Sequence, residues 1–256
     1  MPLAVNYRGT RVPILLGACF TGFLVLVVGL STFWSWLVTG HLATEQGTLV
    51  WILIGIVAVF AAGLYDDFRP SRTRGLVNQI SLAVRGTVTS GVIKMLVIVG
   101  ASAFVAWMIG ARGWRLALGV PVMSGCANLW NLLDVKPGRA LKAFIPAVVG
   151  VGVAAGGLFS AILAFPSAAG GAVALWLDLL EWAMLGDGGS NVLGFAVGAG
   201  LLLSVPTGGL AVALVVILLL HVLAETVTLS RTIEATPPLR WLDRLGRREV
   251  PARPSE

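Results

Sequence analysis

Charge is scarce in this sequence, and the scarcity excludes a soluble protein. Only 12% of the 256 residues are charged, whereas 57% are hydrophobic and the mean hydropathy is +0.91. A soluble domain of this length carries about twice that share of charged residues. Cysteine is also rare. Cys19 and Cys126 both lie in apolar stretches, so the sequence has neither a disulfide framework nor a cysteine metal-binding motif.

Positive charge is in excess, but it does not form a surface for nucleic acid. The formal net charge is +6. The lysines and arginines lie in short segments between hydrophobic stretches and in the last part of the chain, from residue 231 onward. A nucleic-acid-binding domain gathers such residues on one face or along one helix, so nucleic acid is not expected as a partner.

Long hydrophobic stretches fill most of the chain. A helix that crosses a membrane needs about 20 apolar residues, and several uncharged stretches reach that length. The first, residues 12–40, is longer than the core of a signal peptide and has no clear cleavage site, so we expect a retained helix. Two stretches are too long for one helix, and Pro and Gly predict turns at residues 165–167 and 205–209. The sequence predicts an all-α, polytopic integral membrane helix bundle with about eight transmembrane helices, at residues 13–38, 48–65, 91–110, 115–133, 141–163, 167–183, 190–205 and 208–229.

The positions of Lys and Arg predict how these helices are oriented. Cytoplasmic loops of membrane proteins carry an excess of positive residues. If the spans alternate, nearly all basic residues of the loops and of the tail fall on one side. We therefore expect both termini in the cytoplasm, with residues 1–230 as a transmembrane domain and residues 231–256 as a basic cytoplasmic tail. Residues 239–245 have the pattern of a short amphipathic helix on the anionic inner leaflet; a flexible tail is the alternative.

Three acidic motifs fall on this same side of the predicted bundle. Asp66 and Asp67 follow the second span, Asp134 follows the fourth, and Asp187 follows the sixth. Adjacent carboxylates repel each other unless a cation or basic groups offset their charge. Mg²⁺ prefers hard oxygen ligands and often binds one or two carboxylates together with substrate phosphates. The motifs therefore predict a Mg²⁺ site, and an ordinary solvated pair of loop carboxylates is the alternative for the first of them.

The second motif places polar residues at intervals of three. Asn128, Asn131 and Asp134 lie along one stripe of a helix, near the end of the fourth span. Polar side chains are costly inside a membrane, so this stripe needs a ligand, water or another helix as its partner. Hydrogen bonding between helices is the alternative for the two asparagines. His221, in the eighth span, has no evident partner in the sequence.

Basic and glycine-rich segments near the acids favour a phosphate ligand. Arg139 follows the second motif, and Lys94 lies about one helical turn inside the third span. Both cations suit phosphate oxygens, although anchoring at the membrane surface explains them equally well. Gly186 and Ser190 bracket the glycine-rich segment that opens the seventh span. Such a segment either binds an anion at the helix N-terminus or serves as a helix cap.

Taken in order, the motifs resemble those of a known family. Over most of its length, the chain resembles the polyprenyl-phosphate N-acetylhexosamine-1-phosphate transferases. This family includes the phospho-MurNAc-pentapeptide translocases and the undecaprenyl-phosphate GlcNAc-1-phosphate transferases. The resemblance is carried by Asp66-Asp67, Asn128-x-x-Asn131-x-x-Asp134 and Gly186-Asp187-x-Gly-Ser190-x-x-x-Gly194.

The resemblance implies that a lipid phosphate displaces UMP from a UDP-sugar, with Mg²⁺, at the cytoplasmic face of a bacterial-type inner membrane. It implies that Asp187 binds Mg²⁺ and that Asn131 with Asp134 holds the nucleotide or the metal. It also implies that Asp66 or Asp67 assists with or accepts the proton of the lipid phosphate. The implied partners are polyprenyl phosphate, a UDP-sugar and membrane lipids, with a homodimer left open. The candidate substrate-binding residues are Asn128, Asn131, Arg139, Lys94, Gly186 and Ser190.

The sequence also departs from this family. The better-known members continue the second motif as Asp-Gly-x-Asp-Gly, whereas here Asp134 is followed by Val-Lys-Pro-Gly. A His-rich loop near the end of those members has no counterpart, and the predicted spans are fewer than usual. Two other functions therefore stay open: a transporter or flippase for a phosphorylated or lipid-linked substrate, and a catalytically inactive relative.

Overall fold

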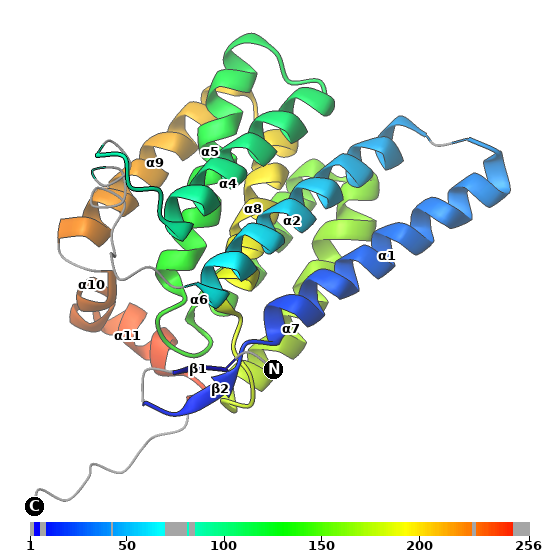
Figure 1. The fold of residues 1–256 in the computed structure, drawn as a ribbon. Helices are drawn as coiled ribbons and strands as arrows, with labels where there is room; N and C mark the ends of the chain where they lie inside the picture. Colours follow the sequence, from blue (N-terminus) through cyan, green and yellow to red (C-terminus); the bar gives the residue numbers. More distant parts are fainter. Residues whose placement is uncertain are drawn as a thin grey trace, which may run out of the picture.

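Long apolar helices packed side by side form most of the molecule (Figure 1). The computed structural model describes residues 3–5, 9–41, 43–69, 81, 85–226 and 229–247. The long helices are α1 (Leu16–Thr39), α2 (Thr44–Phe68), α4 (Ser90–Met108), α5 (Gly113–Leu133), α6 (Arg139–Ala155), α7 (Phe165–Leu179), α8 (Gly186–Ser204) and α9 (Thr207–Thr226). The short elements are β1 (Leu3–Val5), β2 (Arg11–Pro13), the π-helix η1 (Phe159–Ala164), α10 (Leu229–Ala235) and α11 (Pro237–Arg244).

Length and composition make this chain a multi-pass membrane protein. Within the described part of the chain, six helical units are long and apolar enough to cross a membrane: α1, α2, α4, α5, the continuous η1–α7 unit, and α9. The predicted all-α membrane bundle is confirmed at this level, and the short antiparallel pair β1–β2 does not change the class. Helices α6 and α8 coincide with two further predicted spans, but they are not among the six. The count of eight stays a prediction.

Helix α8 is the centre of the bundle. It packs against α5, α2, α6 and α1, and most of its residues are buried. Glycines allow this close packing: a Cβ on Gly194 would overlap the carbonyl oxygen of Cys126, and one on Gly198 would lie 2.7 Å from the Cα of Met123. Between membrane helices, small residues let the backbones approach and increase the van der Waals contact. The glycine-rich sequence of α8 thus suits a helix that is surrounded by others.

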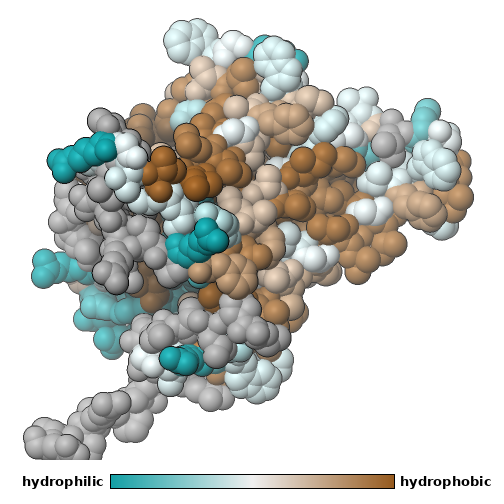
Figure 2. All heavy atoms as spheres, viewed as in Figure 1, coloured by the Kyte–Doolittle hydropathy of each residue, from teal (hydrophilic) through white to brown (hydrophobic). Residues whose placement is uncertain are grey.

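The outer face of the bundle is apolar. Figure 2 shows hydrophobic side chains over the sides of the helices, with hydrophilic ones gathered mainly near α10 and α11. Trp34 on α1, Leu96 on α4 and Leu219 on α9 are each more than three-fifths exposed. Such exposure of large apolar side chains is expected where lipid rather than water surrounds the helices.

One predicted turn is wrong and the other is confirmed. The chain does not turn at residues 165–167. Helix α6 ends at Ala155, and Gly156 and Gly157 follow with φ angles of 66° and 56°, which glycine adopts without steric cost. Pro166 instead lies in the first turn of α7, which continues η1 without a break. At residues 205–209, α8 does end at Ser204, and α9 begins at Thr207.

The short elements gather at one end of the bundle. Figure 1 shows β1, β2, α10 and α11 at the same end as the start of α6 and the end of α7. The first and last described elements therefore lie on the same side of the molecule. Strand β2 leads directly into α1, and Met184, just before α8, donates to the carbonyl of Pro13 at 3.0 Å. The cytoplasmic assignment of this end stays a prediction.

Candidate active site

A buried lysine joins two acidic motifs that are far apart in the sequence. The Nζ atom of Lys94 on α4 lies 2.7 Å from Oδ2 of Asp66 on α2 and 2.5 Å from Oδ2 of Asp187 on α8. The side chains of Lys94 and Asp66 are only 10% and 11% exposed, whereas that of Asp187 is 35% exposed. We call these three residues the Lys94 centre. Its ammonium pairs with both carboxylates, and Asp187 is the member most open to a ligand.

Close contact between two helices positions this centre. A Cβ on Gly63 of α2 would lie 2.5 Å from the Cα of Gly188 and 2.6 Å from the carbonyl oxygen of Asp187. Only glycine permits this approach of backbone to backbone. Since Asp66 follows Gly63 by three residues, it lies on the same side of α2. The contact therefore brings the first and third acidic motifs together.

Asp67 has a different role from its neighbour Asp66. Its Oδ1 accepts from the backbone N–H of Asp187 at 2.9 Å, and its Oδ2 accepts from that of Gly188 at 3.1 Å. The first N–H groups of a helix have no partner within the helix, and a negative charge is favourable there. Asp67 therefore caps α8 from another helix. The glycine-rich segment is a capped helix start, and its cap is neither Asp187 nor Ser190.

The two asparagines of the second motif hydrogen-bond to other helices. Ser190, which is fully buried, donates to Oδ1 of Asn131 at 3.1 Å and to the carbonyl of Gly186 at 2.9 Å. This links α5 to the start of α8, beside the Lys94 centre. Asn128 lies 2.9 Å from Nε2 of His221 on α9. These contacts agree with the helix-pairing alternative for the asparagines.

The His221 ring has a defined tautomer, although the sequence showed no partner for it. Its Nδ1 lies 2.8 Å from the carbonyl oxygen of Ile217, which accepts and cannot donate. In a neutral ring the proton is therefore on Nδ1, and Nε2 accepts from the amide of Asn128. This pair connects α5 to α9.

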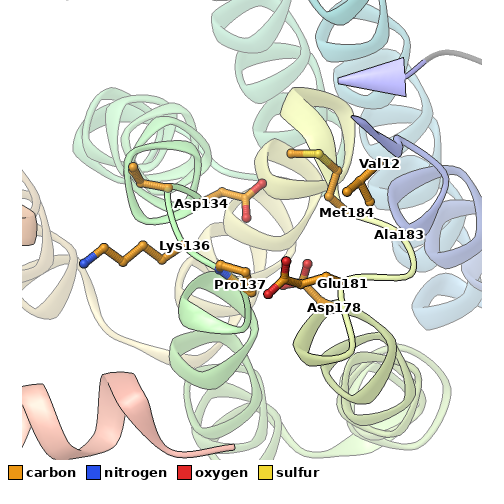
Figure 3. Close-up of a pocket in the computed structure, with 9 residues that line it drawn as sticks. Val12, Asp134, Lys136, Pro137, Asp178, Glu181, Ala183 and Met184 are labelled. Atoms are coloured by element: carbon orange, nitrogen blue, oxygen red, sulfur yellow. The ribbon is translucent and has the colours of Figure 1, made fainter. Parts of the chain in front are cut away.

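Asp134 opens into a small acidic pocket next to these motifs. In Figure 3 its carboxylate points into the space opposite Asp178 and Glu181, and Lys136 points away. The cavity volume is about 40 Å³, enough for a few water molecules. Its lining comprises Val12, Asp134, Val135, Lys136, Pro137, Asp178, Glu181, Ala183 and Met184.

The electrostatic surroundings of Asp134 disfavour its charged form. Removal from water raises the pKa of this carboxyl well above its ordinary value. The nearby carboxylates of Asp178, Asp187 and Asp67 raise the pKa further, in that order of size. A carboxyl of this kind can hold a proton or receive a cation, and it lies close enough to the Lys94 centre to be influenced by its charges.

Asp178 holds the loop beside this pocket. Gly138 has a φ angle of 75°, and its N–H donates to Oδ2 of Asp178 at 2.6 Å. Asp178 is almost fully buried. The same carboxylate thus fixes the α5–α6 connection and lines the pocket with Asp134.

Arg139, a candidate phosphate ligand, binds the C-terminal segment. Its Nε donates to Oδ1 of Asp243 on the C-terminal helix at 2.8 Å, and its Nη2 donates to Oδ2 at 3.2 Å. Its Nη1 donates to Ser230 at 2.8 Å. Each of its nitrogens therefore has a partner in the C-terminal segment, so Arg139 is placed to hold that segment.

The C-terminal segment also engages the other basic residues of the α5–α6 region. Arg247 binds both oxygens of Asp243, at 2.9 and 2.6 Å, and donates to the carbonyl of Pro137 at 2.9 Å. Lys142 donates to three carbonyls at the end of α11, and Lys136 pairs with Glu234. We call Asp243, Arg139 and Arg247 the C-terminal clamp.

The clamp strongly favours the charged form of Asp243. Burial by itself raises the pKa of this carboxyl, but hydrogen bonds from Arg139 and Arg247 outweigh burial and lower the pKa to about 2. The carboxylate is therefore ionised in the whole physiological range. It holds the loop that ends at Gly138 through the Arg247–Pro137 contact.

Sequence reasoning missed several of these polar residues. Asp178 carried a signal, because it is an acid three residues before Glu181 and it precedes the third motif. The sequence signal for Asp243 was weaker, because one acid among arginines is typical of a solvated tail. The sequence contains no signal for the role of His221, because its partner is on another helix.

The site has oxygen ligands for a metal ion but no complete protein cage. Among the residues that the structure describes, no three His, Cys, Asp or Glu side chains form a group able to hold a metal ion. The Oδ2 atoms of Asp66 and Asp187 do converge on one cation, the ammonium of Lys94. Two carboxylates fit Mg²⁺ that is completed by water and by substrate phosphates.

Comparison with known proteins does not identify the chain: no family model matches the sequence, and no characterised protein matches it significantly. The functional interpretation therefore depends on the Lys94 centre, the capped start of α8 and the acidic pocket.

Proposed function

We propose that this protein is a membrane enzyme that transfers a sugar-1-phosphate from a UDP-sugar to a polyprenyl phosphate, with release of UMP. An oxygen of the lipid phosphate would attack the phosphorus that carries the sugar. The bond from that phosphorus to UMP would break, and a polyprenyl-diphosphate sugar would form. The site would lie at the cytoplasmic face of a bacterial-type cell membrane, within a bundle of about eight spans.

The observation that carries this proposal is the Lys94 centre. Asp66 and Asp187 are 121 positions apart, yet both bind one buried ammonium at the end of the bundle where the polar motifs lie. Buried charges are costly in a membrane protein and typically mark function. A transporter typically has its polar site near the middle of the membrane, so the position of this centre favours an interfacial reaction between a lipid and a water-soluble donor.

The different contacts of Asp66 and Asp67 support a division of roles. Both oxygens of Asp67 accept backbone N–H groups of α8, which leaves Asp67 as a positioning residue. The carboxylate of Asp66 instead meets side chains, foremost that of Lys94 at 2.7 Å, and these are able to move. We therefore assign to Asp66 the acceptance of the proton from the lipid phosphate, and to Lys94 the contact with phosphate oxygens as the attack proceeds.

The oxygen donors of the centre fit a magnesium ion that is shared with the substrate. Asp187, the most exposed of the three residues, would hold it, with Asp66 or Asp134 as a second carboxylate. When bound, Mg²⁺ would neutralise the charge of the diphosphate. Asp187 and its neighbours would do the binding and orienting, with α8 held in register by the cap from Asp67.

The test is an assay of UMP release. Purified full-length protein in detergent receives Mg²⁺, undecaprenyl phosphate and each of a panel of UDP-sugars. We expect lipid-dependent UMP from at least one donor, and loss of it with EDTA. Asp187→Asn should reduce the rate by about 100-fold or more. Glu45→Gln, at the opposite end of α2 from Asp66, is the matched control and should keep the rate.

The other two functions predict different results. A transporter would move its substrate across reconstituted vesicles without chemical change and would release no UMP. An inactive relative would release no UMP and would bind neither Mg²⁺ nor UDP-sugar. Either result, obtained with folded protein, would overturn the transferase proposal.

A further inference from the structure

Helix α11 has two faces of opposite character. With about 3.6 residues per turn, its residues divide into an apolar half and a polar half. The apolar half comprises Leu239, Trp241 and Leu242, with Leu245 directly after the helix, and the polar half comprises Arg240, Asp243 and Arg244, with Arg247 three residues beyond the helix end.

Asp243 and Arg247, on the polar side, face the protein. Asp243 is 7% exposed and binds Arg139 at the start of α6, while Arg247 donates to Pro137. The helix end is also fixed, since Lys142 donates to the carbonyls of Leu242, Asp243 and Leu245. These contacts hold α11 in one orientation.

The apolar half is left exposed. Trp241 is 66% exposed, Leu245 50%, Leu242 45% and Leu239 44%. A helix on the surface of a soluble protein does the opposite and buries its apolar face. Three large apolar side chains on one short helix, together with Leu245 directly after it, therefore require a nonpolar environment other than the protein interior.

The position of α11 shows which environment is available. It is bound to Arg139, the first residue of α6, and to Lys142 in the first turn of that helix. At its end, a Cβ on Gly246 would lie 3.1 Å from Leu179, the last residue of the apolar helix α7. Helix α11 thus lies at the level where helices of the bundle end, which is the level of the lipid headgroups.

The charges beside the apolar face indicate the type of lipid. Arg240 and Arg244 are both exposed. Arginine near a membrane surface is attracted to anionic headgroups, and tryptophan is enriched at the boundary between headgroups and hydrocarbon. Leu, Trp and Arg arranged in this way are typical of a helix that lies in the plane of the membrane surface.

We propose that α11 is an interfacial helix that docks on the anionic lipid surface of the membrane crossed by the bundle. Its residues Leu239, Trp241, Leu242 and Leu245 enter the headgroup region, and Arg244, at the edge of this apolar face, contacts lipid phosphates. Since the opposite face of α11 is bound by the C-terminal clamp, the same helix links the lipid surface to the loop beside Asp134. The docking itself does not depend on the proposed transferase activity.

The test uses a fluorescent label on full-length protein in vesicles. A Cys19→Ser/Cys126→Ser background receives Leu242→Cys, labelled with the environment-sensitive dye NBD, and Arg240→Cys is the matched control on the polar half. We expect the label at position 242 to emit at shorter wavelength, to be quenched by brominated lipid and to be shielded from iodide. The label at position 240 should be more accessible to iodide. Replacement of phosphatidylcholine by a mixture with phosphatidylglycerol should increase the quenching by lipid at position 242.

Two further variants keep the result decisive. Leu219→Cys, on the exposed face of α9, must be quenched by brominated lipid if the bundle is inserted and folded. Trp241→Cys replaces the first variant if Leu242→Cys does not fold. Equal quenching by iodide at positions 242 and 240, without quenching by lipid, would place α11 in water and overturn the proposal. Self-quenching at position 242 that rises with the protein-to-lipid ratio would show a second copy on this face and would also overturn it.

Discussion

Asp66 and Asp67 are adjacent residues of the same type, but they have different roles in the candidate active site. Asp66 binds a lysine side chain, whereas Asp67 binds two backbone N–H groups of α8. A buried carboxylate with a side-chain partner can exchange that partner for a ligand. A carboxylate that caps a helix cannot leave without destabilising the helix start.

Asp66→Asn and Asp67→Asn should therefore differ in the property that they change. Asp66→Asn should lower the rate of UMP release by about 100-fold or more, with a small change in the free energy of unfolding. Asp67→Asn should cost about 1 kcal/mol of stability, because the charged cap of α8 is lost. Parallel measurements of rate and thermal unfolding check both. Equal rate losses without any loss of stability would contradict the division of roles.

The ionised form of Asp134 lowers the stability of the folded protein. Its pKa is raised, so its ionised form is disfavoured in the folded protein. The cost is absent below the ordinary pKa, where both folded and unfolded forms are protonated, and it grows as the pH rises toward the folded value.

Asp134→Asn should accordingly stabilise the protein at neutral pH while it lowers the rate of UMP release. The gain in unfolding temperature should shrink as the pH falls toward the ordinary value of 3.8. Thermal unfolding of wild type and variant between pH 4 and pH 8 measures this difference. A variant that is less stable at every pH would show that Asp134 is a structural residue rather than a functional one.

Among the elements, the contact between α2 and α8 determines the geometry of the site. It depends on Gly63, where a Cβ would meet the backbone of Asp187 and Gly188. It places the first acidic motif beside the third and allows Asp67 to cap α8.

Gly63→Ala should separate these helices and lower both stability and activity. Forcing an extra methyl into a packed contact costs about 1–3 kcal/mol. Gly47→Ala, in the same helix with no atom within 4 Å of the added Cβ, is the matched control and should be neutral or slightly stabilising. Thermal unfolding and UMP release of the two variants check this. Equal behaviour of the two would refute the importance of the contact.

The C-terminal clamp is the second contact between elements that stabilises this end of the bundle. The pKa of Asp243 is lowered to about 2, so its ion pairs add stability above its ordinary pKa of 3.8 that is lost as the pH falls through about 2. Asp243→Asn should cost on the order of 2 kcal/mol at neutral pH, less where solvent screens the pairs. Glu234→Gln, which removes an exposed pair, should change stability little. A destabilisation that is equal for both variants, measured by denaturation at pH 7, would contradict the role of the clamp.

For the whole molecule, the path of the chain after α6 is the point on which sequence and structure differ most. The structure turns the chain at Gly156 and Gly157 and buries Ser167 completely. Residues 156–158 therefore lie at the end of the bundle opposite the Lys94 centre.

Cysteine labelling should locate this turn. In a protein without Cys19 and Cys126, Leu158→Cys should react with a membrane-impermeant maleimide on the side of the membrane opposite α11. Ser167→Cys should stay unreactive, and labelling of position 167 but not of position 158 would restore the turn at residues 165–167. Sealed vesicles with and without permeabilisation give the sidedness.

The sequence by itself determined the class of protein, most helices and the polar residues of interest, because hydropathy, helix length and charge are properties of short segments. It also indicated that Asp66, Asp134 and Asp187 lie on one side, since alternating spans impose this. Only the tertiary structure decided which groups these residues meet. Lys94 binds Asp66 and Asp187, Asp67 caps α8, His221 pairs with Asn128, and Arg139 binds Asp243. Each of these pairs joins separate helices, and their contacts depend on how closely glycine lets the helices pack, which no local pattern encodes.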